Sequence, residues 1–340
     1  MKSAKTLAVA GLLSASFAMP AAHAGATLDA VKKNDAVKCG INTPFPGFAN
    51  QDEKGNWSGL DIDVCRAVAA AIFGDPNKVK FTSLTAKERF TALQSGEVDL
   101  LSRNSTGTLS RDTGMGLTFV APNYYDGQGF LVKKSLNVKS AKELDGASVC
   151  IQSGTTTELN LADYFRANNM KFEPITYEKL DEVTKAFDEG RCDVLTSDQS
   201  QLYSNRITLK DPEGAVVLPE VISKEPLGPF VRQGDDEWLK IVRWSYYAMV
   251  EAEDLGITSA NADEMTKSAD PNIKRFLGME EGGDANLPLD KKWAYNIVKM
   301  VGNYSESFER SVGQGSPLKI NRGLNALWKN GGLQYSPPFR

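Results

Sequence analysis

Short apolar runs and amphipathic segments alternate along the first half of the chain. Over residues 60–73 apolar residues recur three and four positions apart, which predicts a helix ending at Gly74-Asp75-Pro76. Apolar runs that are too short for helices predict buried strands. The predicted order is strand 36–42, helix 60–73, strand 79–84, helix 87–95 and strand 98–101.

The same order recurs downstream, as strand 148–152, helix 157–168, strand 172–177, helix 180–189 and strand 193–196. The segments 92–101 and 186–195 also share a pattern, in which a helix ends at a glycine and a buried strand follows directly. This repetition predicts an α/β fold with two similar lobes, each a mostly parallel sheet flanked by helices.

Two further helices are predicted near the end of the chain. Helix 236–254 places Trp238, Ile241, Val242 and Met249 on one face, which we expect to pack on the first lobe. Another helix is expected at about 293–308.

The first 24 residues have the pattern of a secretory signal peptide. Lys2 and Lys5 precede an apolar run at 7–19, and Ala22-His23-Ala24 is a small-x-small cleavage site. The run is shorter than the roughly 20 residues that span a bilayer, although an uncleaved N-terminal anchor is the alternative. No cysteine near residue 24 could take a lipid, so we expect an exported chain that begins at Gly25.

Composition narrows the function classes. The chain has 340 residues and a formal net charge of −4, which becomes −6 without the two lysines of the signal. An acidic chain without basic runs argues against nucleic acid and anionic membrane surfaces as partners. The one histidine, His23, lies in the signal, so the exported chain lacks Ser-His-Asp and Cys-His sites and the commonest metal ligand. Catalysis by carboxylates or lysine stays open.

Polar residues follow the predicted strands, where open α/β sheets bind their ligands. They are Asn42, then Ser102-Arg103-Asn104, then residues 152–156, then Ser197-Asp198. Four such ends predict a site for a polar small molecule.

Several motifs together resemble the polar amino acid family of periplasmic solute-binding proteins, and especially the general L-amino acid-binding proteins of ABC importers. They are Gly59-Leu-Asp61-Ile-Asp63, Thr108-Leu-Ser-Arg111, Gln152-Ser-Gly154-Thr155-Thr156, Gly190-Arg-Cys-Asp193-Val-Leu-Thr-Ser-Asp198, Trp293-Ala-Tyr-Asn-Ile and Gly302-Asn-Tyr-Ser-Glu-Ser-Phe. The resemblance implies a periplasmic, monomeric protein without a cofactor. It would capture free L-amino acids with broad specificity by lobe closure and deliver them to a membrane permease.

The resemblance also implies a periplasmic binding protein-like fold with a two-crossing hinge. Lobe 1 would comprise residues 25–126 and 224–340 with a C-terminal extension, and lobe 2 residues 127–223. Two other functions remain open: an enzyme on the same scaffold, such as a dehydratase of an aromatic amino acid precursor, and a sensory domain.

An amino acid presents a carboxylate and an ammonium, and the resemblance assigns a partner to each. Arg111 matches the arginine that clamps the carboxylate, with Thr106, Thr155 and Thr156 as further donors. The alternatives are a solvated arginine and threonines that cap a helix. Asp198 matches the position that accepts the ammonium, or it is an N-cap.

The remaining ligand residues concern the side chain. The resemblance implies that Phe45 stacks on the ligand, and Phe48 is either wall or core. Relatives that select cationic amino acids carry aspartate at the position of Asn42 and serines at those of Arg103 and Asn104, so these departures fit broad specificity. Arg103 is either a pocket donor or a surface charge. Asp61 and Asp63, two apart on a helix, are expected to face different directions in its first turn.

The four cysteines allow three pairings. We favour Cys39–Cys65 and Cys150–Cys192, each within one lobe, because pairs between lobes would oppose hinge motion. Each bridge would add roughly 3–4 kcal/mol on the loop-entropy model.

Overall fold

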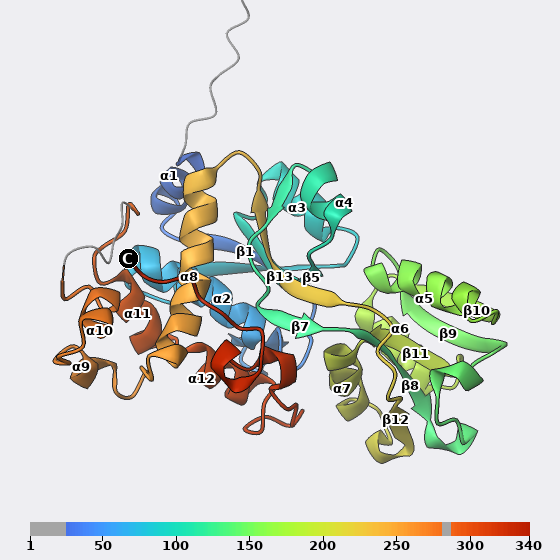
Figure 1. Ribbon diagram of the computed structural model, residues 1–340. Coiled ribbons are helices and arrows are strands. Elements are labelled where there is room, and N and C mark those ends of the chain that lie inside the picture. The colour runs from blue at the N-terminus through green and yellow to red at the C-terminus, as the bar shows by residue number, and fades with distance from the viewer. Residues whose placement is uncertain (1–24, 281–286) are drawn as a thin grey trace, which may run out of the picture.

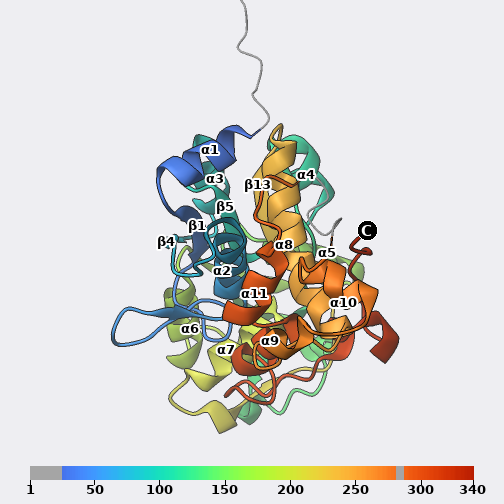
Figure 2. The same ribbon diagram turned by 90° about the vertical axis from the view of Figure 1, so that its left-hand side faces the viewer.

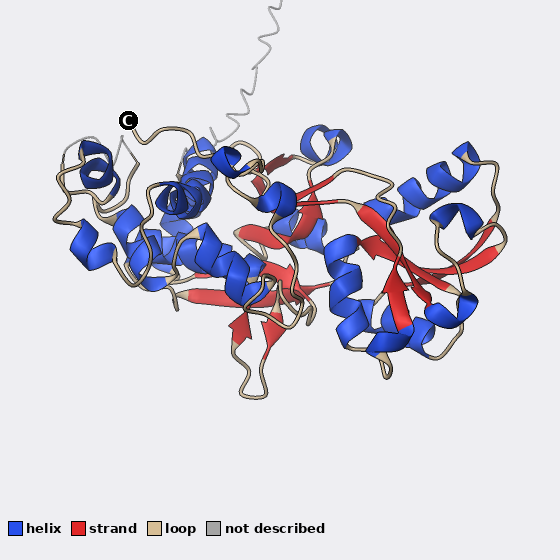
Figure 3. Cartoon of the chain, turned by 60° about the horizontal axis from the view of Figure 1, so that its bottom comes forward, coloured by secondary structure: helices blue, strands red, loops and turns tan. Residues whose placement is uncertain are grey.

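Two α/β lobes lie side by side in the computed structural model, which describes residues 25–280 and 287–340 (Figure 1). The predicted signal peptide at 1–24 lies outside the described residues. The strands gather into two groups, one in each lobe (Figure 3). Apart from a two-stranded hairpin, each group forms one sheet, so the two-lobed α/β architecture predicted from the sequence is confirmed.

The first lobe is built on a six-stranded sheet in which β1 pairs in parallel with β4 and β5, and β13 runs antiparallel to β5. The strands in spatial order are β4 (Val79–Leu84), β1 (Val37–Asn42), β5 (Leu100–Thr106), β13 (Glu225–Arg232) and β6 (Leu117–Phe119), with β7 (Tyr124–Asp126) also paired to β13. Its helices are α1 (Ala26–Lys33), α2 (Leu60–Phe73), α3 (Arg89–Ser95), α4 (Leu109–Gly114) and α8 (Asp236–Asp254). The hairpin strands are β2 (Asn50–Gln51) and β3 (Trp57–Ser58).

The second lobe repeats this plan with a five-stranded sheet. Its strands in spatial order are β10 (Phe172–Tyr177), β9 (Ala147–Gln152), β11 (Val194–Asp198), β8 (Gln128–Lys133) and β12 (Ala215–Val217). Its helices are α5 (Thr156–Ala167), α6 (Leu180–Asp188) and α7 (Gln199–Ile207). Short 3-10 helices elsewhere are η1 (Lys134–Leu136), η2 (Ala141–Glu143), η3 (Pro212–Gly214), η4 (Gly323–Asn325) and η5 (Trp328–Asn330).

Residues after 259 add short helices that pack on the α2 and α8 side of the first lobe (Figure 2). They are α9 (Ala262–Met265), α10 (Pro271–Phe276), α11 (Trp293–Met300) and α12 (Tyr304–Ser311). The single helix expected at 293–308 is wrong, because the chain breaks at Gly302, whose φ is 97°. Asn303 then starts α12 with a capping box formed with Glu306.

Two strands run further than the sequence predicts. The strand expected at 98–101 continues to Thr106, so Arg103 and Asn104 lie within β5 rather than beyond its end. Pairing with β13 supplies backbone hydrogen-bond partners for this extra length. The strand expected at 193–196 likewise reaches Asp198.

The polypeptide passes between the two sheets twice. The first crossing leads from β7 to β8 through Gly127, and the second leads from β12 to β13. The crossings touch, because Ile222 N donates to Gln128 O at 2.9 Å and Gln128 N donates to Ser223 Oγ at 3.2 Å. A Cβ on Gly127 would lie 2.8 Å from the Ser223 carbonyl oxygen and 2.2 Å from Val221 Cγ1. Glycine is therefore required at this position by close approach.

Disulfides join Cys39 to Cys65 and Cys150 to Cys192, which is the pairing favoured from the sequence. The first ties β1 to α2 and the second ties β9 to the turn before β11. Neither restrains one sheet against the other. Within the described part of the chain, no helix is both long enough and apolar enough to cross a bilayer.

We expect Gly127→Ala to destabilise the protein by roughly 1–3 kcal/mol, because the added methyl group overpacks the contact between the crossings. Urea unfolding would measure the change. Gly114→Ala is the matched control, since a Cβ there meets no atom within 4 Å and alanine favours the helical conformation. Equal stability of the two variants would contradict the close-approach argument.

Candidate functional site

Polar side chains from both lobes meet between the sheets. Thr106 Oγ1 of β5 lies 3.4 Å from Thr156 Oγ1 of α5, and Asn104 Nδ2 lies 3.5 Å from Gln201 Oε1 of α7. Each pair joins a residue of the first sheet region to one of the second. The polar residues at the carboxyl ends of the strands of one lobe therefore face those of the other lobe.

Arg111 projects from α4 into this region and is buried, which excludes the solvated alternative. Its Nη1 donates to the Thr106 carbonyl oxygen at 3.0 Å, and its guanidinium carbon lies 5.1 Å from the centre of the Phe90 ring. Thr108 caps α4 by accepting from Arg111 N. One face and one nitrogen of the guanidinium are thus occupied by protein.

Two more arginines are buried nearby, and each has a guanidinium nitrogen without a protein partner. Arg103 is 2% exposed, donates from Nε to Leu84 O at 3.0 Å, and leaves Nη2 unpartnered. Arg103 is therefore not a surface charge. Arg89 is 3% exposed, its Nη2 lies 3.4 Å from Gly154 O of the other lobe, and its Nε is unpartnered.

Burial of these cations has an electrostatic cost. Desolvation, opposed in part by Asp61, lowers the pKa of Arg103 to about 10. Desolvation and then the neighbouring charges of Arg103 and Arg111 lower the pKa of Arg89 well below its usual value. Within the described residues, no ion pair joins any of the three arginines to a carboxylate. An anionic group of a ligand could pair with these guanidinium groups.

Asp198 lies on the second-lobe side at the end of β11 and is 7% exposed. It occupies the N-cap position of α7, but its carboxylate makes no capping bond, and its Oδ1 has no partner. Instead, Asp126 accepts from Ser200 N at 3.2 Å in the first turn of α7. The N-cap alternative for Asp198 therefore fails, and an unpaired acceptor remains.

Glu225, at the start of β13, holds the predicted threonines in place. Its Oε2 accepts from Thr106 Oγ1 at 2.6 Å and from Thr156 Oγ1 at 3.0 Å, and its Oε1 accepts from Asn160 Nδ2 at 2.7 Å. A single carboxylate thus bridges β5 and α5. Thr155 caps no amide with its side chain, and its hydroxyl donates to Gln152 O at 2.7 Å.

Asp61 supports the floor of the site from α2. It is completely buried and accepts from Asn104 N at 2.8 Å and from Asn123 Nδ2 at 3.1 Å. Asn104, at a φ of 29°, in turn accepts from Asn42 Nδ2 at 2.9 Å. Asp63 points elsewhere, to Ser307 and Arg310 of the C-terminal region, so the expectation of different directions is confirmed.

Phe45 and Phe48 belong to the hydrophobic core of the first lobe and are both fully buried. Their rings stack 4.7 Å apart, and the edge of Tyr124 contacts Phe48 at 5.3 Å between centroids. Both rings lie in the core of the first lobe, and a ligand contact by Phe48 stays a prediction. A ligand contact by Phe45 stays a prediction, with one ring face already covered by Phe48.

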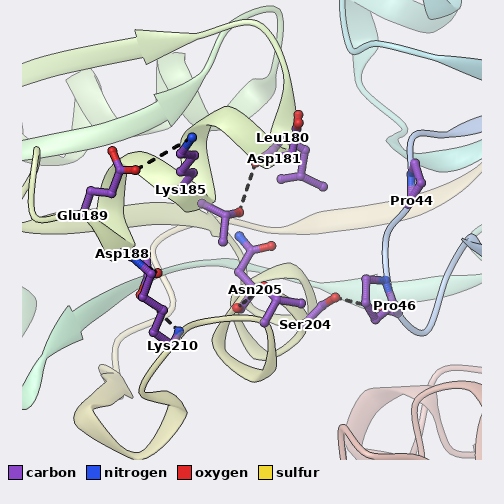
Figure 4. A pocket seen from close by; sticks show the side chains of 12 residues that line it. Pro44, Pro46, Leu180, Asp181, Lys185, Asp188, Glu189, Ser204, Asn205 and Lys210 are labelled. Carbon is purple, nitrogen blue, oxygen red and sulfur yellow. Dashed lines mark hydrogen bonds and ion pairs between the residues drawn. The ribbon is translucent and has the colours of Figure 1, made fainter.

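A groove of 480 Å³ lies beside the site, between the loop after β1 and helices α6 and α7 (Figure 4). Ser204 Oγ donates to Pro46 O at 3.0 Å and links its two sides. None of the ten predicted ligand residues lines this groove. Among the described residues, no group of three or more His, Cys, Asp or Glu side chains could hold a metal ion.

Sequence reasoning missed four groups in or under the site: Arg89, Asp61 as a support, Asp126 and Glu225. Arg89 had one detectable signal, because a cation in the first turn of a helix is unfavourable beside the helix dipole. The place of the other three in the site carries no local signal, because the contacts that define it, to Asn104, Thr106 and Ser200, lie at least 43 residues away in the chain.

The chain is similar to a family of known proteins. Residues 37–259 match the bacterial extracellular solute-binding proteins, family 3. The general L-amino acid-binding periplasmic protein AapJ of Rhizobium johnstonii is 61% identical, over 94% of both chains. The glutamate/glutamine/aspartate/asparagine-binding protein BztA of Rhodobacter capsulatus is 53% identical, over 96% of this chain and 98% of its own.

A solved structure is also similar. It is a periplasmic binding protein of an ABC transporter from Brucella ovis with glutathione bound. The two chains are 58% identical, the TM-score is 0.91, and the match covers 92% of this chain and 99% of the other.

The acidic groups of the site predict a pH effect on the protein without ligand. Desolvation is the main cause that raises the pKa of Asp126 to about 6, and desolvation followed by the charges of Asp126 and Glu225 raises that of Asp198 well above its usual value. A raised carboxyl pKa favours the folded state at low pH, and this contribution is lost as pH rises through the folded pKa. We expect Asp198→Asn to gain stability relative to the wild-type protein between pH 5 and pH 7.5, as measured by urea unfolding. Asp181→Asn, on the surface, should show no such trend, and a parallel trend for both variants would contradict the assignment.

Proposed function

Because the chain belongs to the bacterial extracellular solute-binding proteins of family 3, we propose that it captures free L-amino acids between its lobes and delivers them to the membrane permease of an ABC importer. The proposal includes a periplasmic, monomeric protein that accepts several side-chain classes. The relatives AapJ and BztA are binding proteins, which supports capture over the dehydratase alternative.

One observation carries the proposal: unpaired opposite charges face each other across the lobes. Arg111 and the two other arginines project from the first lobe, while Asp198 offers an unpartnered Oδ1 from the second. The ends of an L-amino acid, a carboxylate and an ammonium, complement this arrangement. Such a ligand touches both lobes, so it binds the closed form better and shifts the population towards closure.

The side-chain preference follows from the surplus of guanidinium groups. A ligand carboxylate occupies one clamp, and three buried arginines are present. The nitrogens left on Arg89 and Arg103 suit a second anionic or amide group on the ligand. We therefore propose that acidic and amide side chains bind more tightly than neutral aliphatic ones, in line with the names of BztA and of the glutathione-bound relative.

Native mass spectrometry of freshly purified protein tests the central claim, because a co-purified amino acid would name the ligand. Calorimetry with L-glutamate, L-glutamine, L-alanine and their D-isomers tests the breadth. Absence of heat with every L-amino acid would overturn the function, whereas binding of one side-chain class would overturn only broad specificity.

Arg111→Ala should weaken binding of every amino acid by a similar factor, because all share the carboxylate. Truncating one member of a buried charged pair costs roughly 2–5 kcal/mol, or about thirty-fold to several thousand-fold in affinity. Asp198→Asn should act in the same side-chain-independent way through the ammonium. Titration calorimetry measures both, and undiminished affinity of Arg111→Ala for several amino acids would refute the clamp.

Arg89→Gln should act selectively. We expect the affinity for L-glutamate to fall by at least about tenfold more than that for L-alanine, because only glutamate carries a second carboxylate to lose a charged partner. Lys87→Gln is the matched control: it removes a positive charge two residues away, from a half-exposed side chain that pairs with Glu178. Equal losses for both ligands in Arg89→Gln would place Arg89 outside side-chain recognition.

A further inference from the structure

A segment beyond the region that matches the family, residues 318–325, reaches the crossings between the lobes. The loop that follows α12 runs beside β7 (Figure 1). Residues 318–325 face β7, Gly127 and the start of α7 across a groove of 400 Å³. The C-terminal region therefore lies against the segment about which the lobes would move.

Asn325 makes the direct contact with this segment. Its Oδ1 accepts from Tyr125 N at 2.7 Å, and its Nδ2 donates to Tyr125 O at 3.1 Å. On the other side of β7, Tyr125 is opposite Pro226, which has no N–H to donate. The side-chain amide of Asn325 thus satisfies both backbone groups of Tyr125, as a neighbouring strand would.

Asn325 is itself held in place by Arg322. Arg322 donates to Asn325 O from Nε at 3.1 Å and from Nη2 at 3.0 Å. The same guanidinium pairs with Glu253 of α8 at 3.0 Å and covers the Phe308 ring of α12 at 4.9 Å. The amide that holds Tyr125 is therefore fixed to the helices behind the first sheet.

The residue after Tyr125 leads directly to the second lobe. Asp126 accepts from Ser200 N, in the first turn of α7, and α7 begins immediately after Asp198. Any shift of Tyr125 would move Asp126, and with it the end of α7 that presents Asp198. A short chain of contacts consequently links Asn325 to the second-lobe half of the site.

We propose that Asn325 is a positioning residue for ligand capture. It fixes the first-lobe side of the first crossing, so that rotation between the lobes is confined to Asp126 and Gly127 and Asp198 arrives in register with Arg111. The role in capture rests on the proposed function, whereas the mechanical link from residue 325 to α7 does not. If the first crossing is more flexible, the lobes also adopt arrangements in which Asp198 and Arg111 are misaligned. The binding-competent fraction is then lower, and the affinity for every ligand falls by the same factor.

The test compares Asn325→Ala with Asn325→Asp, which keeps the acceptor for Tyr125 N and loses the donor. Asn261→Ala is the matched control, because it removes two side-chain to backbone bonds that are confined to residues 256–261. Hydrogen exchange with mass spectrometry would follow peptides covering 124–128 and 199–203 in the protein without ligand. Calorimetry would follow L-glutamate and L-alanine.

For Asn325→Ala we expect faster exchange in both peptides and a loss of affinity of about three- to thirtyfold, equal for the two ligands, from the loss of two hydrogen bonds. The exchange rates and affinities of Asn325→Asp should lie between those of Asn325→Ala and those of the wild-type protein. Asn261→Ala should change neither the exchange rates nor the affinities. Faster exchange at 124–128 alone, with exchange at 199–203 and affinity unchanged, would overturn the proposal. If the unchanged protein binds no amino acid, the proposed function fails, and exchange at 199–203 still decides the mechanical link.

Discussion

Burial of unpaired charge between the lobes is the constraint on which the rest of the structure depends. Arg89, Arg103, Arg111 and Asp198 are all buried, yet no ion pair joins an arginine to the aspartate within the described residues. An isolated buried charge is costly in a folded protein. The fold tolerates it here because the charges of opposite sign are mounted on different lobes, where a zwitterionic ligand can compensate both.

Glu225 and Asp61 support the polar residues that lie next to these charges. Glu225 accepts hydrogen bonds from the hydroxyl groups of Thr106 and Thr156, and Asp61 accepts one from the backbone amide of Asn104. Among the buried atoms left without a partner are Arg89 Nε, Arg103 Nη2 and Asp198 Oδ1. Ligand groups of opposite charge can pair with these three atoms.

The disulfides, the two crossings and the C-terminal helices follow the same division into two lobes. Each disulfide stays within one sheet region, and the two crossings touch through Gly127 and Ser223. The C-terminal helices pack on the first lobe and send one loop to the hinge. Each lobe is therefore cross-linked within itself, and the polypeptide passes between the two sheets at the two crossings.

The sequence by itself determined the repeated strand–helix order, the polar strand ends and the likeness that assigns Arg111 and Asp198, because hydrophobic periodicity and motif spacing are local properties. Tertiary structure alone decided that Arg89 enters the site, that Asp198 does not cap α7, and that the rings of Phe45 and Phe48 stack in the core of the first lobe. It also placed Asp61 under Asn104 and Asn325 on Tyr125, 43 and 200 residues apart. Burial and hydrogen bonding of such groups depend on neighbours that only folding brings together, and no periodicity in the chain records them.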